Sequence, residues 1–86
     1  MKNNIFEIDT NCRLVVKETH EIVPLDEPVF ILRAKDKKAL AAIVAYRSSF
    51  NPFSQEERQI QKIINEFREF KQENADLMQD PETAYN

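Results

Sequence analysis

The sequence predicts an α+β fold, with a small antiparallel sheet of three or four strands over residues 5–34 followed by two helices. Two observations support this prediction. Short runs of β-branched and aromatic residues, separated by turn-forming residues, fill the first third of the chain. Beyond residue 36 the apolar residues recur at helical spacing. A length of 86 residues allows one domain, which we expect over residues 1–78, with a polar, disordered tail over residues 79–86.

The strands are expected at residues 5–8, 13–17 and 22–23, with a further strand at Val29–Arg33. Val29–Arg33 is the strongest of these predictions. Its four consecutive apolar side chains indicate burial on both faces, as a central strand or as one that lies under a partner. The chain contains no glycine, so left-handed turn positions are expected at asparagine or aspartate, such as Asn11, Asp26 and Asn51.

Two helices are expected in the second half of the chain. Asp36 is a suitable N-cap for a helix over residues 37–48, and Ser54 with Glu57 fits a reciprocal capping box for a second helix that ends near Asn74 or Leu77. The second helix has an apolar stripe that is wide for so small a chain. We therefore expect a homo-oligomer, most simply a two-fold dimer, formed through the stripe residues Ile60, Ile63, Ile64, Phe67 and Phe70.

The charges are distributed unevenly along the chain. Residues 1–27 have a net charge of −3 and residues 56–86 of −4, whereas residues 28–55 have a net charge of +4. Lysines in the first turn of a helix are disfavoured by the helix dipole, by roughly 0.3–1 kcal/mol each. A feature that breaks a local rule is a candidate for function, here an anion site at the junction of strand and helix. The candidate ligand-binding residues are Arg33, Lys35, Lys37, Lys38 and Arg47, with Phe30 or Tyr46 as the candidates for stacking on a base.

Composition argues against several classes of function. The absence of glycine removes glycine-rich phosphate loops, and one histidine with one cysteine cannot close a zinc site. No nucleophile and base stand in a recognisable arrangement, so we expect a protein that is not an enzyme and that has no cofactor and no metal. A pI near 5.1 argues against nucleic acid as a partner. The sequence shows no apolar run of membrane-spanning length and no signal segment. Its one thiol, Cys12, is expected to be buried, and a single cysteine favours a reducing compartment. We therefore expect a cytoplasmic protein.

The stretch Glu27–Asp36, with Ala39, Leu40 and the helix through Tyr46, resembles a pattern in short uncharacterised proteins of bacteriophages and prophages. In those proteins an E-P-x-F-x-L-R-A-x-D strand and turn precedes an alanine-rich helix and a second helix with an aromatic residue near its end. The resemblance covers about residues 24–78. It implies a non-enzymatic protein of the host cytoplasm that sequesters either a host protein or a nucleotide signal of an antiviral defence system.

Two functions remain open at this stage. The first is sequestration of a phosphorylated nucleotide-like signal by an oligomer, through the basic residues named above. The second is an inhibitor or adaptor that presents its acidic surface to a basic site on a host protein; the flanking segments, with their summed net charge of −7, favour it.

Overall fold

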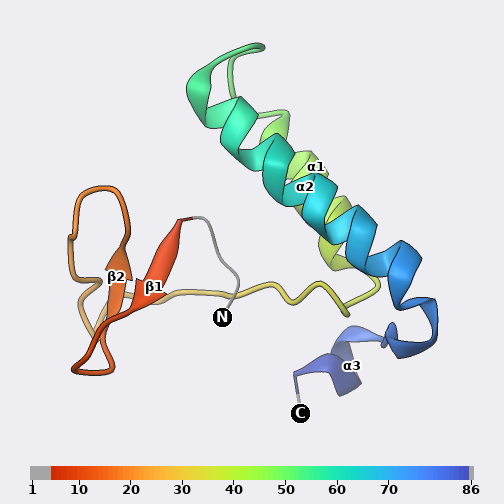
Figure 1. The fold of residues 1–86 in the computed structure, drawn as a ribbon, viewed down its shortest axis with the longest axis horizontal. Helices are drawn as coiled ribbons and strands as arrows, with labels where there is room; N and C mark the ends of the chain where they lie inside the picture. Colours follow the sequence, from red (N-terminus) through yellow and green to blue (C-terminus); the bar gives the residue numbers. More distant parts are fainter. Residues whose placement is uncertain (1–4, 86) are drawn as a thin grey trace. The chain divides into compact units, whose positions relative to one another are not determined.

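The structure is a computed structural model, and it describes residues 5–85. It confirms an α+β fold with a two-stranded antiparallel sheet and two main helices (Figure 1). The chain divides between Phe30 and Ile31 into two compact units, each of which is described by itself below. This division differs from the single domain that was expected over residues 1–78, of which residues 1–4 lie outside the described range.

The first unit is built on a short hairpin. Strand β1, Phe6–Ile8, pairs with strand β2, Leu14–Val16, so that Glu7 lies opposite Val15. On the other side of β2 the chain returns for a single bridge, Val15 with Ile22, where a third strand was expected. Val15 is 6 % exposed and forms the apolar centre of this unit. The coarse prediction of strands in this region is therefore correct, whereas a sheet of three or four strands is not formed within the described residues.

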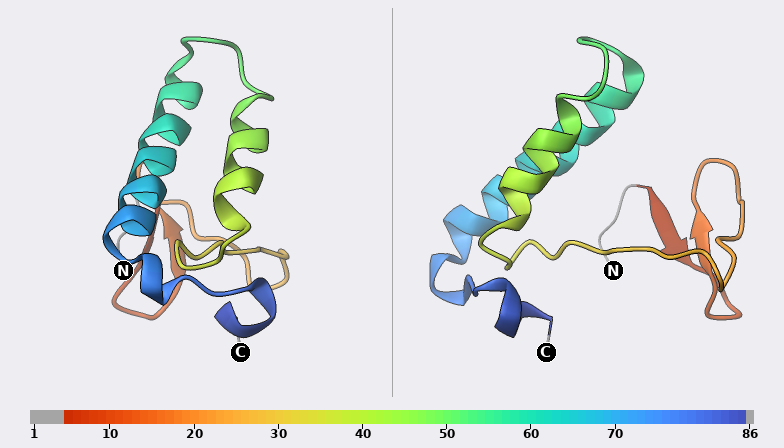
Figure 2. Two further views of the ribbon diagram at one scale, coloured as in Figure 1. Left: turned by 90° about the vertical axis from the view of Figure 1, so that its right-hand side faces the viewer. Right: turned by 180° about the vertical axis from the view of Figure 1, so that it is seen from behind.

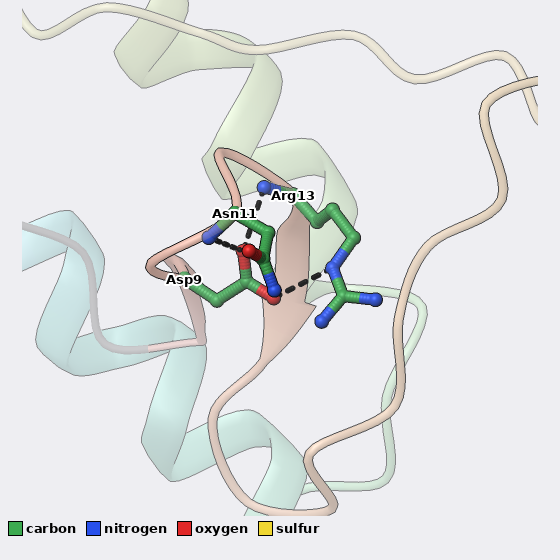
Figure 3. Close-up of polar contacts among 3 residues, drawn as sticks. All are labelled: Asp9, Asn11 and Arg13. Carbon is green, nitrogen blue, oxygen red and sulfur yellow. Dashed lines mark hydrogen bonds and ion pairs between the residues drawn. The ribbon is translucent and has the colours of Figure 1, made fainter.

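The turn between β1 and β2 is organised by the carboxylate of Asp9. Figure 3 shows this carboxylate accepting hydrogen bonds from the backbone N–H of Asn11 and of Arg13, at 2.9 and 2.8 Å, and from Arg13 Nε at 2.8 Å. The Arg13 backbone bond is the main reason why the pKa of Asp9 lies below its ordinary value. Asp9 thus supplies, through its side chain, the hydrogen bonds that fix a turn without glycine.

The prediction of a strand at Val29–Arg33 is wrong for the isolated chain. Residues 28–33 form an irregular stretch without strand pairing, drawn in Figure 1 as the yellow chain before α1. A strand requires a neighbouring strand, and the two strands of the first unit have three residues each. Turns close on either side of the stretch, from Pro24 to Glu27 and from Arg33 to Asp36. Of the four apolar side chains that were expected to be buried, Val29, Phe30 and Ile31 are exposed and Leu32 is half-buried.

The second unit is built on two helices, α1 (Ala39–Arg47) and α2 (Gln55–Glu73), which lie side by side as an antiparallel hairpin (Figure 2). Its buried apolar side chains are small or β-branched and come from three elements. They are Ala39, Ile43, Ile60, Ile64 and Ala84. The other members of the predicted α2 stripe, Ile63, Phe67 and Phe70, are half-buried, so part of the stripe is already covered by the chain itself.

The capping box predicted for α2 has two hydrogen bonds, of which one is present and the other has a different partner. Ser54 Oγ accepts a hydrogen bond from the backbone N–H of Glu57 at 3.1 Å, as predicted. The Glu57 carboxylate, however, accepts from the backbone N–H of Phe53 at 3.0 Å, one residue before the expected partner. The cause is the turn at residues 51–54, which is closed by a bond from Ser54 N–H to the Asn51 carbonyl.

Among residues 5–85 the left-handed positions fall at Cys12, His20 and Phe53, with φ of 62°, 61° and 63°, so the predicted use of asparagine or aspartate is wrong there. All three residues donate their backbone N–H within a turn: Cys12 to the Asp9 carbonyl at 3.0 Å, and His20 to the Val16 carbonyl at 2.8 Å. Phe53 follows Pro52 at a turn position that glycine usually occupies, and the Glu57 carboxylate holds its N–H. Cys12 is exposed and not buried as expected, because it lies in the turn between β1 and β2.

The chain after α2 is ordered and folds back on the second unit. A 3-10 turn, η1 (Ala75–Leu77), leads to the short helix α3 (Pro81–Ala84), in which Ala84 is fully buried. The structure therefore differs from the disordered tail that was expected over residues 79–86, of which Asn86 lies outside the described residues. The polar composition of this segment concealed the contacts that fix it.

Candidate functional site

The positively charged candidate site lies on the turn that precedes α1, and this turn is organised by Asp36. We call the four cations Arg33, Lys35, Lys37 and Lys38 the basic turn. The Asp36 N–H donates to the Arg33 carbonyl at 3.0 Å, and Asp36 Oδ1 accepts from the Lys38 N–H at 2.8 Å. Helix α1 begins at Ala39, with Lys38 and not Asp36 at the N-cap position. Asp36 nevertheless acts as predicted in one respect, because its carboxylate receives an N–H at the start of the helix.

The C-terminal segment, residues 79–85, lies along the basic turn. The Lys37 N–H donates to the Gln79 carbonyl at 2.9 Å, and the Gln79 N–H donates to the Lys35 carbonyl at 2.8 Å. These two bonds form a parallel bridge between Asp36 and Gln79. Backbone pairing therefore fixes the segment to the turn independently of any side chain.

The Tyr85 hydroxyl joins the two ends of this arrangement. It donates to Asp36 Oδ2 at 2.8 Å and accepts from the backbone N–H of Arg33 at 3.0 Å. Arg33 in turn donates through Nη1 to the Ala84 carbonyl at 2.6 Å. Asp36 is 4 % exposed, so its carboxylate depends on the Lys38 N–H and the Tyr85 hydroxyl for solvation.

The same environment shifts the ionisation of the tyrosine. Burial raises the pKa of Tyr85 above its ordinary value of 10.0, and the hydrogen bond to the Asp36 carboxylate raises it further. Burial disfavours the phenolate, and a neighbouring negative charge does the same. Tyr85 therefore remains a hydrogen-bond donor throughout the neutral range.

The structure brings four of the predicted ligand-binding residues together and leaves three apart. The four are those of the basic turn. Two of the remaining three, Tyr46 and Arg47, are at the opposite end of α1, which at nine residues is about 13 Å long. There Arg47 bonds to Gln61 through its guanidinium, and Tyr46 packs edge-to-face on Phe50, with ring centroids 5.0 Å apart. Phe30 belongs to the first unit.

The four cations differ in how far the protein already uses them. The Arg33 guanidinium holds the Ala84 carbonyl, and Lys37 Nζ lies 3.8 Å from Asp80 Oδ1, with both side chains more than half exposed. Among residues 5–85, the side chains of Lys35 and Lys38 form no ion pair. The basic turn is thus partly a structural junction and partly exposed positive charge.

Sequence reasoning missed Gln79, Ala84 and Tyr85, which complete the site. One local signal was present: Pro81 after Asp80 is a frequent way to begin a helix. The pairing of Tyr85 with Asp36, 49 residues earlier in the chain, has no local signal at all. The side-chain oxygen Oε1 of Gln79 is also buried here and has no hydrogen-bond partner within the described residues.

No family model, no curated protein and no solved structure matches this chain. Two further searches covered the described residues only. None of the helices in residues 5–85 has the length and apolar character needed to cross a membrane. Within the same residues, no three histidine, cysteine, aspartate or glutamate side chains are grouped so that they could hold a metal ion.

Replacing Tyr85 with phenylalanine removes one of the two partners of the buried Asp36 carboxylate. We expect Tyr85→Phe to lower the free energy of unfolding by roughly 1–3 kcal/mol at neutral pH. The matched control is Tyr46→Phe, because the Tyr46 ring is more exposed and its hydroxyl has no partner among residues 5–85; that change should cost less than about 0.5 kcal/mol. Urea unfolding monitored by circular dichroism measures both.

The loss of stability caused by Tyr85→Phe should also depend on pH. Because the pKa of Tyr85 is raised in the folded state, its contribution is fully present below about pH 10 and is lost as the pH rises through the folded-state pKa. The stability difference between wild type and Tyr85→Phe should therefore shrink in strongly alkaline buffer. Equal stability of the two proteins at neutral pH would contradict the role of Tyr85.

Proposed function

We propose that this chain is a non-enzymatic interaction protein that binds a partner protein by strand addition through residues 28–33, here called the extended segment. One observation carries the proposal. The consecutive side chains Val29, Phe30 and Ile31 are 53 %, 78 % and 55 % exposed. Large apolar side chains exposed in an unbroken run are typical of surfaces that a partner covers.

The extended segment has the sequence of a buried strand, but within residues 5–85 it is not paired with a strand and its apolar side chains are not covered. β-branched and aromatic residues are enriched in strands because they pack well on a pleated, covered surface. Within residues 5–85 the backbones of Val29, Ile31 and Leu32 make no hydrogen bond. A partner strand would satisfy these groups and cover the apolar side chains, as in peptide recognition by strand addition. It would also supply the additional strand that the sequence predicts.

The charges next to the extended segment limit the kind of partner. Asp26 and Glu27, here called the acidic turn, directly precede it, and the basic turn follows it. An edge strand with a cation near one end and an acid near the other would complement both. The role of inhibitor or adaptor on a host protein, which the phage-like sequence pattern implies, remains part of this proposal and is supported by that pattern alone.

The proposal predicts that apolar side chains in the extended segment contribute to binding and not to folding. We expect the double variant Phe30→Ser/Ile31→Ser to keep the thermal stability of the isolated chain within about 0.5 kcal/mol, because both side chains are exposed. The variant should lose the proteins that the wild-type chain captures in quantitative cross-linking within cells.

The matched control is Phe53→Ser, since Phe53 is 83 % exposed, is aromatic and lies outside the extended segment. It should capture the same proteins as the wild type. Equal loss in the control, or full retention in the double variant, would contradict strand addition through this segment.

Sequestration of a phosphorylated nucleotide-like molecule at the basic turn is a second candidate function. It is favoured by the charges of the half-buried Lys35 and the exposed Lys38, which have no ion-pair partner within residues 5–85, and by the long, exposed pair between Lys37 and Asp80. A phosphate could replace an exposed carboxylate in such a pair at little cost, because exposed pairs contribute roughly 0–1 kcal/mol. Arg47 and Tyr46 are too far along α1 to share that phosphate.

Charge reversal tests this candidate. If the basic turn binds phosphate, Lys37→Glu/Lys38→Glu should weaken the binding of a panel of linear and cyclic nucleotides at least tenfold in calorimetry. The fold should remain intact, because acids suit the start of a helix. The control Arg58→Glu/Lys62→Glu makes the same change of charge on α2 and should leave binding unchanged. Failure of the wild-type chain to bind any member of the panel would rule the candidate out.

A further inference from the structure

We infer that the first unit is a local folding module, which is mainly open in the free chain and closes when a partner protein covers it. The partner that fits is a protein surface with an apolar area bordered by cations. The inference rests on the interaction role proposed above and adds a folding step to it. It starts from how little the first unit buries.

The core of the first unit is a single side chain. Among residues 5–30 only Val15 is buried, whereas Leu25, in the turn closed by Pro24 and Glu27, is 104 % exposed. The unit has 30 residues, and domains below roughly 40 residues usually need a disulfide or another staple. The chain has one cysteine, so it forms no disulfide within itself. A two-stranded hairpin alone is marginally stable in water.

The strand pairing shows that neither face of the small sheet is fully covered. Val15 lies opposite Glu7 in β1 and opposite Ile22 in the bridge, so these three side chains share one face. Ile8 and Leu14 oppose each other on the other face, because side chains alternate along a strand. Ile22 is 43 % exposed and Ile8 is 54 % exposed. An antiparallel sheet packs at least one face on a core, and here a partner has to supply the cover.

The backbone of the first unit also carries strain in its closed form. Cys12 and His20 have φ of 62° and 61°, a region that is unfavourable for residues with a Cβ atom. Opening the unit releases both residues. With a single buried side chain to oppose this release, the equilibrium in the free chain favours the open form.

Net charge acts in the same direction and indicates the chemistry of the partner. Residues 1–30 contain three bases and six acids, a net charge of −3. Four of the acids are exposed within a stretch of ten residues, namely Glu18, Glu21, Asp26 and Glu27. Self-repulsion destabilises a compact form. A surface with cations around an apolar area removes this repulsion and covers the exposed aliphatic side chains at once.

Amide hydrogen exchange of the free wild-type chain tests the opening. The N–H groups of Val16 and Val23 are bonded inside the first unit, to the carbonyls of Glu21 and Leu14 at 2.8 Å. Both amides should exchange within about tenfold of the rate of an unstructured chain, while amides in the middle of α2 exchange at least a hundredfold more slowly. Stronger protection of Val16 and Val23 than this would overturn the inference.

Two substitutions that shift the opening equilibrium test its coupling to binding. Val15→Ala weakens the core at a buried position that a partner does not contact. It should lower capture at least fivefold in quantitative cross-linking, because only the closed fraction binds. Cys12→Gly relieves a left-handed position and should raise capture severalfold. The matched control, Val44→Ala in α1, makes the first change in the second unit and should leave capture as in the wild type.

A third substitution tests the charge of the partner. Asp26→Asn/Glu27→Gln removes two negative charges, so the first unit should open no more than in the wild type. Capture by a cationic surface should nevertheless fall severalfold, because the complementary charges are lost. Unchanged or increased capture would overturn the cationic partner.

The comparison of variants, and not capture of a protein as such, decides between the folding module and strand addition. If Val15→Ala leaves capture unchanged while Phe30→Ser/Ile31→Ser abolishes it, the proposed function stands and the folding module is wrong. If Val15→Ala lowers capture and the double variant does not, the module stands and strand addition through the extended segment is wrong. If neither variant lowers capture, both fail.

Discussion

The fold of the second unit depends on the solvation of one buried carboxylate. Asp36 is 4 % exposed, and a carboxylate removed from water is costly unless hydrogen bonds replace the lost solvent. The Lys38 N–H and the Tyr85 hydroxyl provide these bonds from opposite directions in the chain. One contact belongs to the start of α1 and the other to the C-terminus, so a single side chain connects local helix initiation to long-range closure of the chain.

The same contacts hold Arg33, which is both the last residue of the extended segment and the first residue of the basic turn. Tyr85 holds the Arg33 N–H, and the Ala84 carbonyl holds the Arg33 guanidinium. The last residue of the extended segment is therefore fixed to the C-terminal segment through its backbone and through its side chain. The lysines that follow are displayed around the same turn, so positive charge marks the end of the segment at which an acidic partner residue would lie.

The sequence is informative where the physical signal is local. The cap of α2 by Ser54 follows from neighbouring residues alone, and so does the helical spacing that places Ile60 and Ile64 toward α1. The Val29–Arg33 strand was mispredicted because strand propensity describes a covered surface and does not say which chain provides the cover. The C-terminal segment was missed because it is held by bonds to residues more than 40 positions away. Of the candidate site, sequence reasoning found the cations and Asp36 but not the tyrosine on which that aspartate depends.

Amide hydrogen exchange of the wild-type chain tests the central role of this junction most directly. The N–H groups of Lys37 and Gln79 bond across it, to the carbonyls of Gln79 and Lys35. If Asp36 and Tyr85 hold the C-terminal segment in place, both amides should exchange as slowly as those in the middle of α1 and α2, because they open only when the unit unfolds. Exchange of the Gln79 amide at the rate of an unstructured chain, with α2 still protected, would contradict it.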